Sequence, residues 1–281
     1  MVDEDKYPVE SDRRRFVKGV VGSAAVATVA ATGAAAIDTA TAPSGAGGGI
    51  RQYFGIDRTD GPAPRGMPLI PVELDDDGNL VGLWPDVEQR EEEGRTIQVA
   101  ETELGGITYS GEWFHYCGRQ NSAAIDPGAD MDNYLRYAEA SLYEWQQADA
   151  PGGEPVHIEH FEDYEEWGNE VGQSGVGKPA QATWRSVDLG PAEQLVVQVI
   201  RSTLIEDAAE ENEWLAEYTD EGFMAFLNVC THFCCVPGYK VTQESERFNA
   251  GDGVYCQCHQ SVYDPFTIRQ QQFVALPRPE D

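Results

Sequence analysis

The sequence predicts an all-β fold of antiparallel sheets with a small lobe near the C-terminus, an inserted and partly helical segment, and an N-terminal helix. Short apolar runs that alternate with Gly, Pro and Asp turns predict the strands. Two motifs rich in Cys and His predict a metal-binding lobe at about residues 228–266. A charge-free apolar run near the N-terminus predicts the helix.

The N-terminal segment, residues 1–37, has the features of an export signal. Asp12-Arg13-Arg14-Arg15-Phe16-Val17-Lys18 precedes an apolar run from Gly19 to Ile37. This is the twin-arginine pattern of the Tat route, which exports folded proteins. The run is just long enough to span a hydrocarbon core of about 30 Å. Retention as a membrane anchor and cleavage, at Ala34-Ala35-Ala36 or Ala40-Thr41-Ala42, are both open.

Residues 38–66 are expected to be a linker, because the Gly-rich stretch from Ala42 to Gly49 predicts flexibility. The domain itself is expected at residues 67–281. Apolar runs at residues 69–72 and 96–99 predict its first strands, and Asp75-Asp76-Asp77-Gly78 predicts a turn.

Residues 105–179 are expected to be an insertion. Apolar side chains recur in it every three or four residues, which predicts an amphipathic helix. These side chains are Met131, Tyr134, Leu135, Ala138, Leu142 and Trp145. Clearer strands follow at residues 195–200 and 222–227, and the second leads into the first Cys/His motif.

The chain is strongly acidic. It has 49 Asp and Glu residues against 19 Lys and Arg residues, a net charge of −30. This composition is typical of salt-loving archaea, because concentrated salt screens the self-repulsion. Nucleic acid is not an expected partner, since it would be repelled.

The two motifs are Cys230-Thr231-His232 and Cys256-Gln257-Cys258-His259. Two pairs of one Cys and one His can each hold one iron of a [2Fe-2S] cluster. A structural zinc ion is the alternative, since it needs four such ligands in a tetrahedron.

The surrounding residues favour the cluster. The stretches Cys230-Thr231-His232-Phe233-Cys234-Cys235-Val236-Pro237 and Cys256-Gln257-Cys258-His259-Gln260-Ser261-Val262-Tyr263-Asp264 resemble the two cluster-binding motifs of Rieske iron–sulfur proteins. The subgroup that they resemble is the respiratory one, found in cytochrome bc-type complexes. The resemblance implies the Rieske fold and one [2Fe-2S] cluster.

The resemblance also implies a role for each residue. Cys230 and Cys256 would bind the buried iron, and His232 and His259 the outer iron. Cys235 and Cys258 would form a disulfide. The Ser261 hydroxyl would donate to a bridging sulfide and Tyr263 to the Cys230 sulfur.

The function that the resemblance implies is electron transfer. His259, with His232 beside it, would take a proton from membrane quinol while the electron goes to iron. A cytochrome b-type subunit and a soluble cytochrome or copper-protein acceptor are the implied partners. The N-terminal segment would stay as an anchor, with the domain outside the cell membrane, and the linker would let the domain swing.

Three alternatives keep an iron–sulfur centre. Rieske subunits of arsenite oxidase or of a nitrate-respiration complex have a similar cluster. A Rieske oxygenase would need a further iron, for which His115, His157 and His160 with Glu159 are the remaining ligands.

Two features depart from the family. Residues 273–277 resemble the third, Pro-containing loop that covers the cluster, but the strands that usually follow it are missing. Either the base fold is trimmed or residues 67–103 supply those strands. Cys117 and Cys234 are spare, and form either a second disulfide or two separate thiols.

Overall fold

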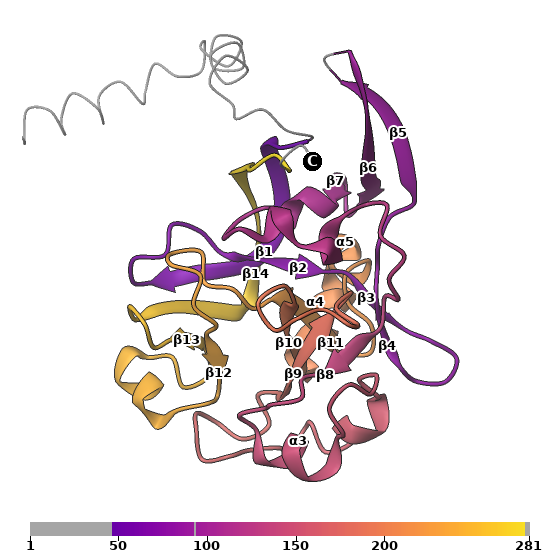
Figure 1. Ribbon diagram of the computed structural model, residues 1–281. Coiled ribbons are helices and arrows are strands. Elements are labelled where there is room, and N and C mark those ends of the chain that lie inside the picture. Colours follow the sequence, from indigo (N-terminus) through magenta and orange to yellow (C-terminus); the bar gives the residue numbers. More distant parts are fainter. Residues whose placement is uncertain (1–46, 93, 279–281) are drawn as a thin grey trace, which may run out of the picture. The chain divides into compact units, whose positions relative to one another are not determined.

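The computed structural model describes residues 47–92 and 94–278 (Figure 1). The expected export signal and anchor, residues 1–37, and the first part of the linker lie outside this range. Within it, no helix combines the length and the apolar character needed to cross a membrane.

The described residues are mostly β-structure in antiparallel sheets, as the sequence predicts. The largest sheet has nine strands in the order β12-β13-β14-β1-β2-β11-β10-β9-β8. Its strands are β1 (Gly49–Asp60), β2 (Met67–Ile70), β8 (Leu135–Tyr137), β9 (Lys178–Trp184), β10 (Leu195–Arg201), β11 (Phe223–Leu227), β12 (Gly238–Tyr239), β13 (Val254–Cys256) and β14 (Ser261–Ala275). The expected lobe lies at the β12 end of this sheet, so the sheet carries the site at one end.

Two smaller sheets come from the predicted strands that follow residue 70. β3 (Val72–Leu74) pairs with β4 (Leu80–Gly82), and the Asp75 carboxylate closes the turn between them by accepting from the Asn79 amide at 2.8 Å. β5 (Val87–Glu92), β6 (Arg95–Leu104) and β7 (Ile107–Ser110) form the other sheet. The β5–β6 hairpin extends away from the large sheet (Figure 1).

The strand β1 corrects the predicted linker. It pairs with β14 from Gly49↔Ala275 to Asp60↔Val262, and Tyr53 and Ile56 are fully buried. Residues 49–66 are therefore part of the folded domain, and the prediction of a flexible linker is wrong for them. The glycines give the chain conformational freedom, but burial of the apolar side chains that follow them contributes more free energy than ordering the glycines costs.

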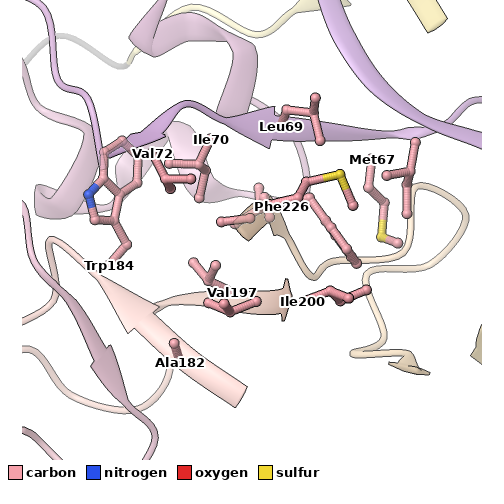
Figure 2. Close-up of a cluster of buried hydrophobic side chains, with 14 of the residues drawn as sticks. Met67, Leu69, Ile70, Val72, Ala182, Trp184, Val197, Ile200 and Phe226 are labelled. Atoms are coloured by element: carbon pink, nitrogen blue, oxygen red, sulfur yellow. The ribbon is translucent and has the colours of Figure 1, made fainter. Parts of the chain in front are cut away.

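The strand β2 joins the two halves of the large sheet. It pairs with β1 through Gly55↔Pro68 and with β11 through Phe226↔Leu69. Figure 2 shows side chains of β2 together with those of β9, β10 and β11, and all of them belong to one buried cluster. Residues 67–70 thus add a strand to the large sheet, as one alternative expected, but β1 comes from the predicted linker, which neither alternative included.

The predicted amphipathic helix of the insertion does not form. Leu135 and Tyr137 are buried two residues apart in β8, which pairs with β9, while Leu142 is exposed. In a strand, every second side chain points to the same face of the sheet. Pairing with β9 therefore buries alternate residues of this stretch, although their spacing in the sequence suits a helix. The insertion is partly helical only in short pieces. These are η3 (Gly111–Phe114), η4 (Arg119–Asn121), η5 (Ala123–Ile125), α3 (Glu144–Asp149) and η6 (Ile158–Phe161).

Three further helical segments were not predicted. Two of them connect β10 to β11, and the first begins where Ser202 Oγ accepts from the Leu204 amide at 3.2 Å. The third lies in the lobe, between β12 and β13. They are α4 (Thr203–Glu211), α5 (Glu213–Ala216) and η7 (Gln243–Phe248).

Candidate metal centre

Two tight turns carry the Cys/His motifs. In the first, after β11, the Cys234 amide donates to Cys230 O at 3.0 Å. In the second, between β13 and β14, the Gln260 amide donates to Cys256 O at 2.8 Å. Cys234 and Gln260 both have left-handed backbones, with φ of 63° and 61°. Each turn therefore folds back over the cysteine that begins it.

The four predicted ligands come together in pairs. Cys230 and Cys256 are free thiols, each 1% exposed, and their sulfurs share a hydrogen bond. The rings of His232 and His259 have centroids 4.8 Å apart at an interplanar angle of 84°. The sulfur pair is buried, whereas His232 is half-buried and His259 exposed. The two sulfurs thus lie together in the interior, and the two imidazole rings lie together in the less buried part of the motifs.

The turns aim amide groups at the two sulfurs. The amides of His232 and Phe233 donate to Cys230 Sγ, and those of Cys258 and His259 donate to Cys256 Sγ. The hydrogen bond from the Cys256 thiol lowers the pKa of Cys230 to about 5, and burial opposes this shift. The same bond, together with burial, raises the pKa of Cys256. These hydrogen bonds therefore favour the thiolate form of Cys230, the form that binds metal.

His232 provides a second test of whether these residues fit a metal centre. Its Nδ1 atom is buried and has no hydrogen-bond partner among the described residues. A buried polar atom without a partner is costly, and one explanation is a bound ion. The residues fit a centre held by two thiolates and two neutral imidazoles.

Tyr263 and Ser261 lie beside Cys230 and Cys256, and both are fully buried. Tyr263 Oη donates to Cys230 Sγ at 3.1 Å and accepts from the Thr231 amide at 3.2 Å. Ser261 Oγ accepts from the Ala63 amide at 3.1 Å. No acceptor for the Ser261 hydroxyl proton is found among residues 47–92 and 94–278, so this proton is free to serve a bound group.

A third loop, residues 61–66, covers the two turns, and sequence reasoning missed it. Thr231 Oγ1 donates to Arg65 O at 2.6 Å, and a Cβ on Gly61 would lie 2.4 Å from Gln260 O. The Gly-Pro-Ala-Pro sequence of this loop was the signal that could have identified it.

Residues 273–277 were predicted to cover the site, but Phe273 packs on Arg65 of the loop of residues 61–66, with 4.0 Å between the guanidinium carbon and the ring centroid, and no contact of residues 273–277 with the two turns is found among the described residues. Ala275 pairs with Gly49 at the end of β14 far from Ser261, and the Leu276 amide donates to His115 O at 3.2 Å. The early position of β1 in the chain explains the difference, because that strand delivers the covering loop instead.

The disulfide that the resemblance implies is present, and so is the second one that the sequence left open. Cys235 joins Cys258, with a Cα–Cα distance of 6.6 Å, and so links the two turns. Cys117 joins Cys234, with a Cα–Cα distance of 5.6 Å, so the alternative of two separate thiols does not hold. The sulfurs of Cys235, Cys256 and Cys258 lie within 4.8 Å of one another and could together bind a metal. We favour Cys230 and Cys256 as ligands, because a disulfide occupies the other two sulfurs.

The remaining histidines are engaged elsewhere. His115 is buried, with Nδ1 2.8 Å from Leu276 O. His157 Nε2 lies 2.8 Å from Asp77 O, and His160 Nδ1 lies 2.9 Å from Tyr137 Oη. Across the described part of the chain, the three cysteines are the only cluster of Cys, His, Asp or Glu with metal-binding spacing. His115, His157 and His160 belong to no such cluster in that part of the chain.

In comparisons with family models, curated proteins and solved structures, none matched this chain. The functional argument therefore depends on the geometry of the site and on the motif residues.

Proposed function

We propose that the domain is a Rieske protein that holds one [2Fe-2S] cluster and carries electrons from quinol. Cys230 and Cys256 would hold the inner iron, and His232 and His259 the outer iron. The observation that carries this proposal is that the two thiols are buried together and the two imidazole rings lie 4.8 Å apart, with His232 Nδ1 buried and without a hydrogen-bond partner among the described residues.

Such a centre supplies reversible one-electron chemistry, at about −150 to +300 mV for clusters with two His ligands. The surrounding residues support this use. Tyr263 and four backbone amides donate to the two sulfurs, and hydrogen bonds to sulfur favour the reduced state. The buried thiols lie away from water, while the imidazoles lie towards it.

The exposed end of the site suits a quinol. Phe233 and Val236 are 66% and 53% exposed, and the Phe233 ring lies 4.3 Å from that of His232 and 5.2 Å from that of His259. An apolar rim around an imidazole matches a ligand with an apolar ring and a polar hydroxyl. The role assigned to His259 is to accept the quinol hydrogen bond and hold its proton on the ring nitrogen that is free of metal.

The proposed setting is a cytochrome bc-type complex at the cell membrane. The domain would lie on the extracytoplasmic face after Tat export and be tethered by residues 1–37. Its partners would be a cytochrome b-type subunit and a soluble cytochrome or copper-protein acceptor. These assignments depend on the motif resemblance and on the N-terminal sequence.

The function is tested by deleting the gene in its host and restoring it as parent or as His259→Ser. We expect membranes to lose quinol:acceptor activity on deletion and to recover it only with the parent chain. Normal quinol oxidation combined with loss of arsenite oxidation, or of nitrate respiration, would assign the protein to one of those complexes instead.

A further inference from the structure

The disulfide Cys117–Cys234 is not needed to link the two metal-binding turns, since Cys235–Cys258 already does so. It joins the first turn to the body of the domain, across a sequence separation of 117 residues. Cys117 follows η3, in which Trp113 and Phe114 are fully buried. The bond therefore ties an exposed turn to a rigid part of the core.

A second contact runs along the same junction. Tyr116 Oη donates to Val229 O at 2.9 Å, and Cys117 Sγ lies 3.8 Å from Cys230 O. Residues 116–117 thus contact the first turn at its start and, through the disulfide, near its end.

Both partners of this disulfide have an unfavourable backbone. Cys117 has φ of 56° and Cys234 has φ of 63°, in the left-handed region that favours glycine. A non-glycine residue remains there only where surrounding contacts hold it. At Cys234, which is exposed, burial contributes little to holding it, so its restraints are the disulfide and the hydrogen bond from its amide to Cys230 O.

The restrained turn is the one that presents amides to Cys230. The donors are the amides of His232 and Phe233, and the Phe233 side chain is too exposed to fix its own backbone. The turn is fixed at Cys230, which begins it, and at Cys234, so its amide directions depend on both ends.

We propose that the Cys117–Cys234 disulfide is a positioning bond that keeps the His232 and Phe233 amides on Cys230 Sγ and thereby raises the electron affinity of the centre. The inference depends on the proposed function, because it concerns the same site. The disulfide Cys235–Cys258 already links the two turns, so the role proposed for Cys117–Cys234 is to tune the redox properties of the centre.

Two double variants test it, Cys117→Ser with Cys234→Ser, and Cys117→Ser with Cys234→Gly. Serine removes the bond and keeps the unfavourable backbone, whereas glycine accepts the left-handed backbone but does not hold it. We expect both variants to keep the centre, with electron affinity about two- to tenfold lower, since one weakened hydrogen bond is at stake. Tenfold corresponds to about 59 mV in the midpoint potential.

Voltammetry measures the potential, and hydrogen exchange of the metal-free proteins measures the turn directly. Faster exchange confined to residues 230–237, together with a lower potential, supports the proposal. If both variants keep the midpoint potential and the hydrogen-exchange rates of the parent protein, the proposal is overturned. If the serine variant does not fold, the glycine variant decides by the same two readouts. A parent chain that binds no iron would refute the proposed function itself, and its iron content is measured first.

Discussion

At the scale of single residues, the Tyr263 hydroxyl is in direct contact with one of the proposed ligands. It donates to Cys230 Sγ at 3.1 Å from a fully buried ring. We expect Tyr263→Phe to keep the centre and to lower its electron affinity by about two- to tenfold. This change corresponds to the loss of one hydrogen bond, which contributes about 0.5–1.5 kcal/mol. Ser261→Ala should act in the same direction. Unchanged midpoint potentials in both variants would refute these roles.

A second prediction concerns His115, far from the ligands in sequence. Its pKa is lowered from 6.5 to about 4, chiefly by burial and also by the charges of Arg278 and Arg51, while the hydrogen bond with Leu276 O opposes the shift. Between these values the unfolded chain binds more protons, so the stability that His115 contributes is complete above pH 6.5 and is lost as the pH falls towards 4.

The change amounts to about 3 kcal/mol, at about 1.4 kcal/mol per pKa unit. His115→Asn should remove it, because asparagine can still donate to Leu276 O and does not titrate. Denaturant unfolding at pH 7 and pH 4 measures the difference between parent and variant. A difference that is the same at both pH values would contradict the assignment.

At the scale of elements, the loop of residues 61–66 lies against both turns of the proposed site. Gly61 and Gly106 both have left-handed backbones, with φ of 81° and 79°. A Cβ on Gly61 would lie 2.4 Å from Gln260 O, whereas one on Gly106 would meet nothing within 4 Å. Alanine at either position would strain the backbone, but only alanine at position 61 would also clash with the second turn, so comparing the two variants separates these effects.

We expect Gly61→Ala and Gly106→Ala each to lose about 1 kcal/mol of stability from the backbone alone. Only Gly61→Ala should also release metal faster, because it displaces residues 260–261. Thermal melting and the rate of iron loss to a chelator measure the two effects. Equal rates of iron loss in the two variants would show that the loop does not close the site.

The elements also show how far the sequence could predict the structure. The strands β10 and β11 and the two turns were predictable, because their signals are local: apolar runs and fixed Cys/His spacings. The role of β1 was not, because its pairing with β14 joins residues more than 200 positions apart. The helical spacing around Leu135 failed because β9 offered a sheet edge, which no local pattern reveals.

At the scale of the whole molecule, charge dominates. The chain has only four lysines, and two of them, Lys178 and Lys240, are buried in ion pairs with Asp163 and Asp252 at 2.6 Å. Basic side chains in the interior leave an acidic surface, whose repulsion acts over about 10 Å at 0.1 M salt and about 3 Å at 1 M.

The melting temperature should therefore rise by several degrees between 0.1 M and 2 M KCl, with roughly 2–4 °C for each kcal/mol of screened repulsion. Glycine betaine at equal osmolarity is the control, since a zwitterion does not screen charge. A flat melting temperature in KCl, or an equal rise in betaine, would contradict an electrostatic origin.

The central claim concerns the whole site: two sulfurs and two imidazoles hold one pair of irons. The most direct measurement is pulsed electron paramagnetic resonance of the reduced protein, with and without ¹⁵N-labelled histidine, alongside iron and acid-labile sulfide analysis. The account predicts equal amounts of iron and sulfide, and couplings from two histidine nitrogens that change on labelling. One zinc ion per chain, or an iron–sulfur signal without histidine coupling, would contradict it.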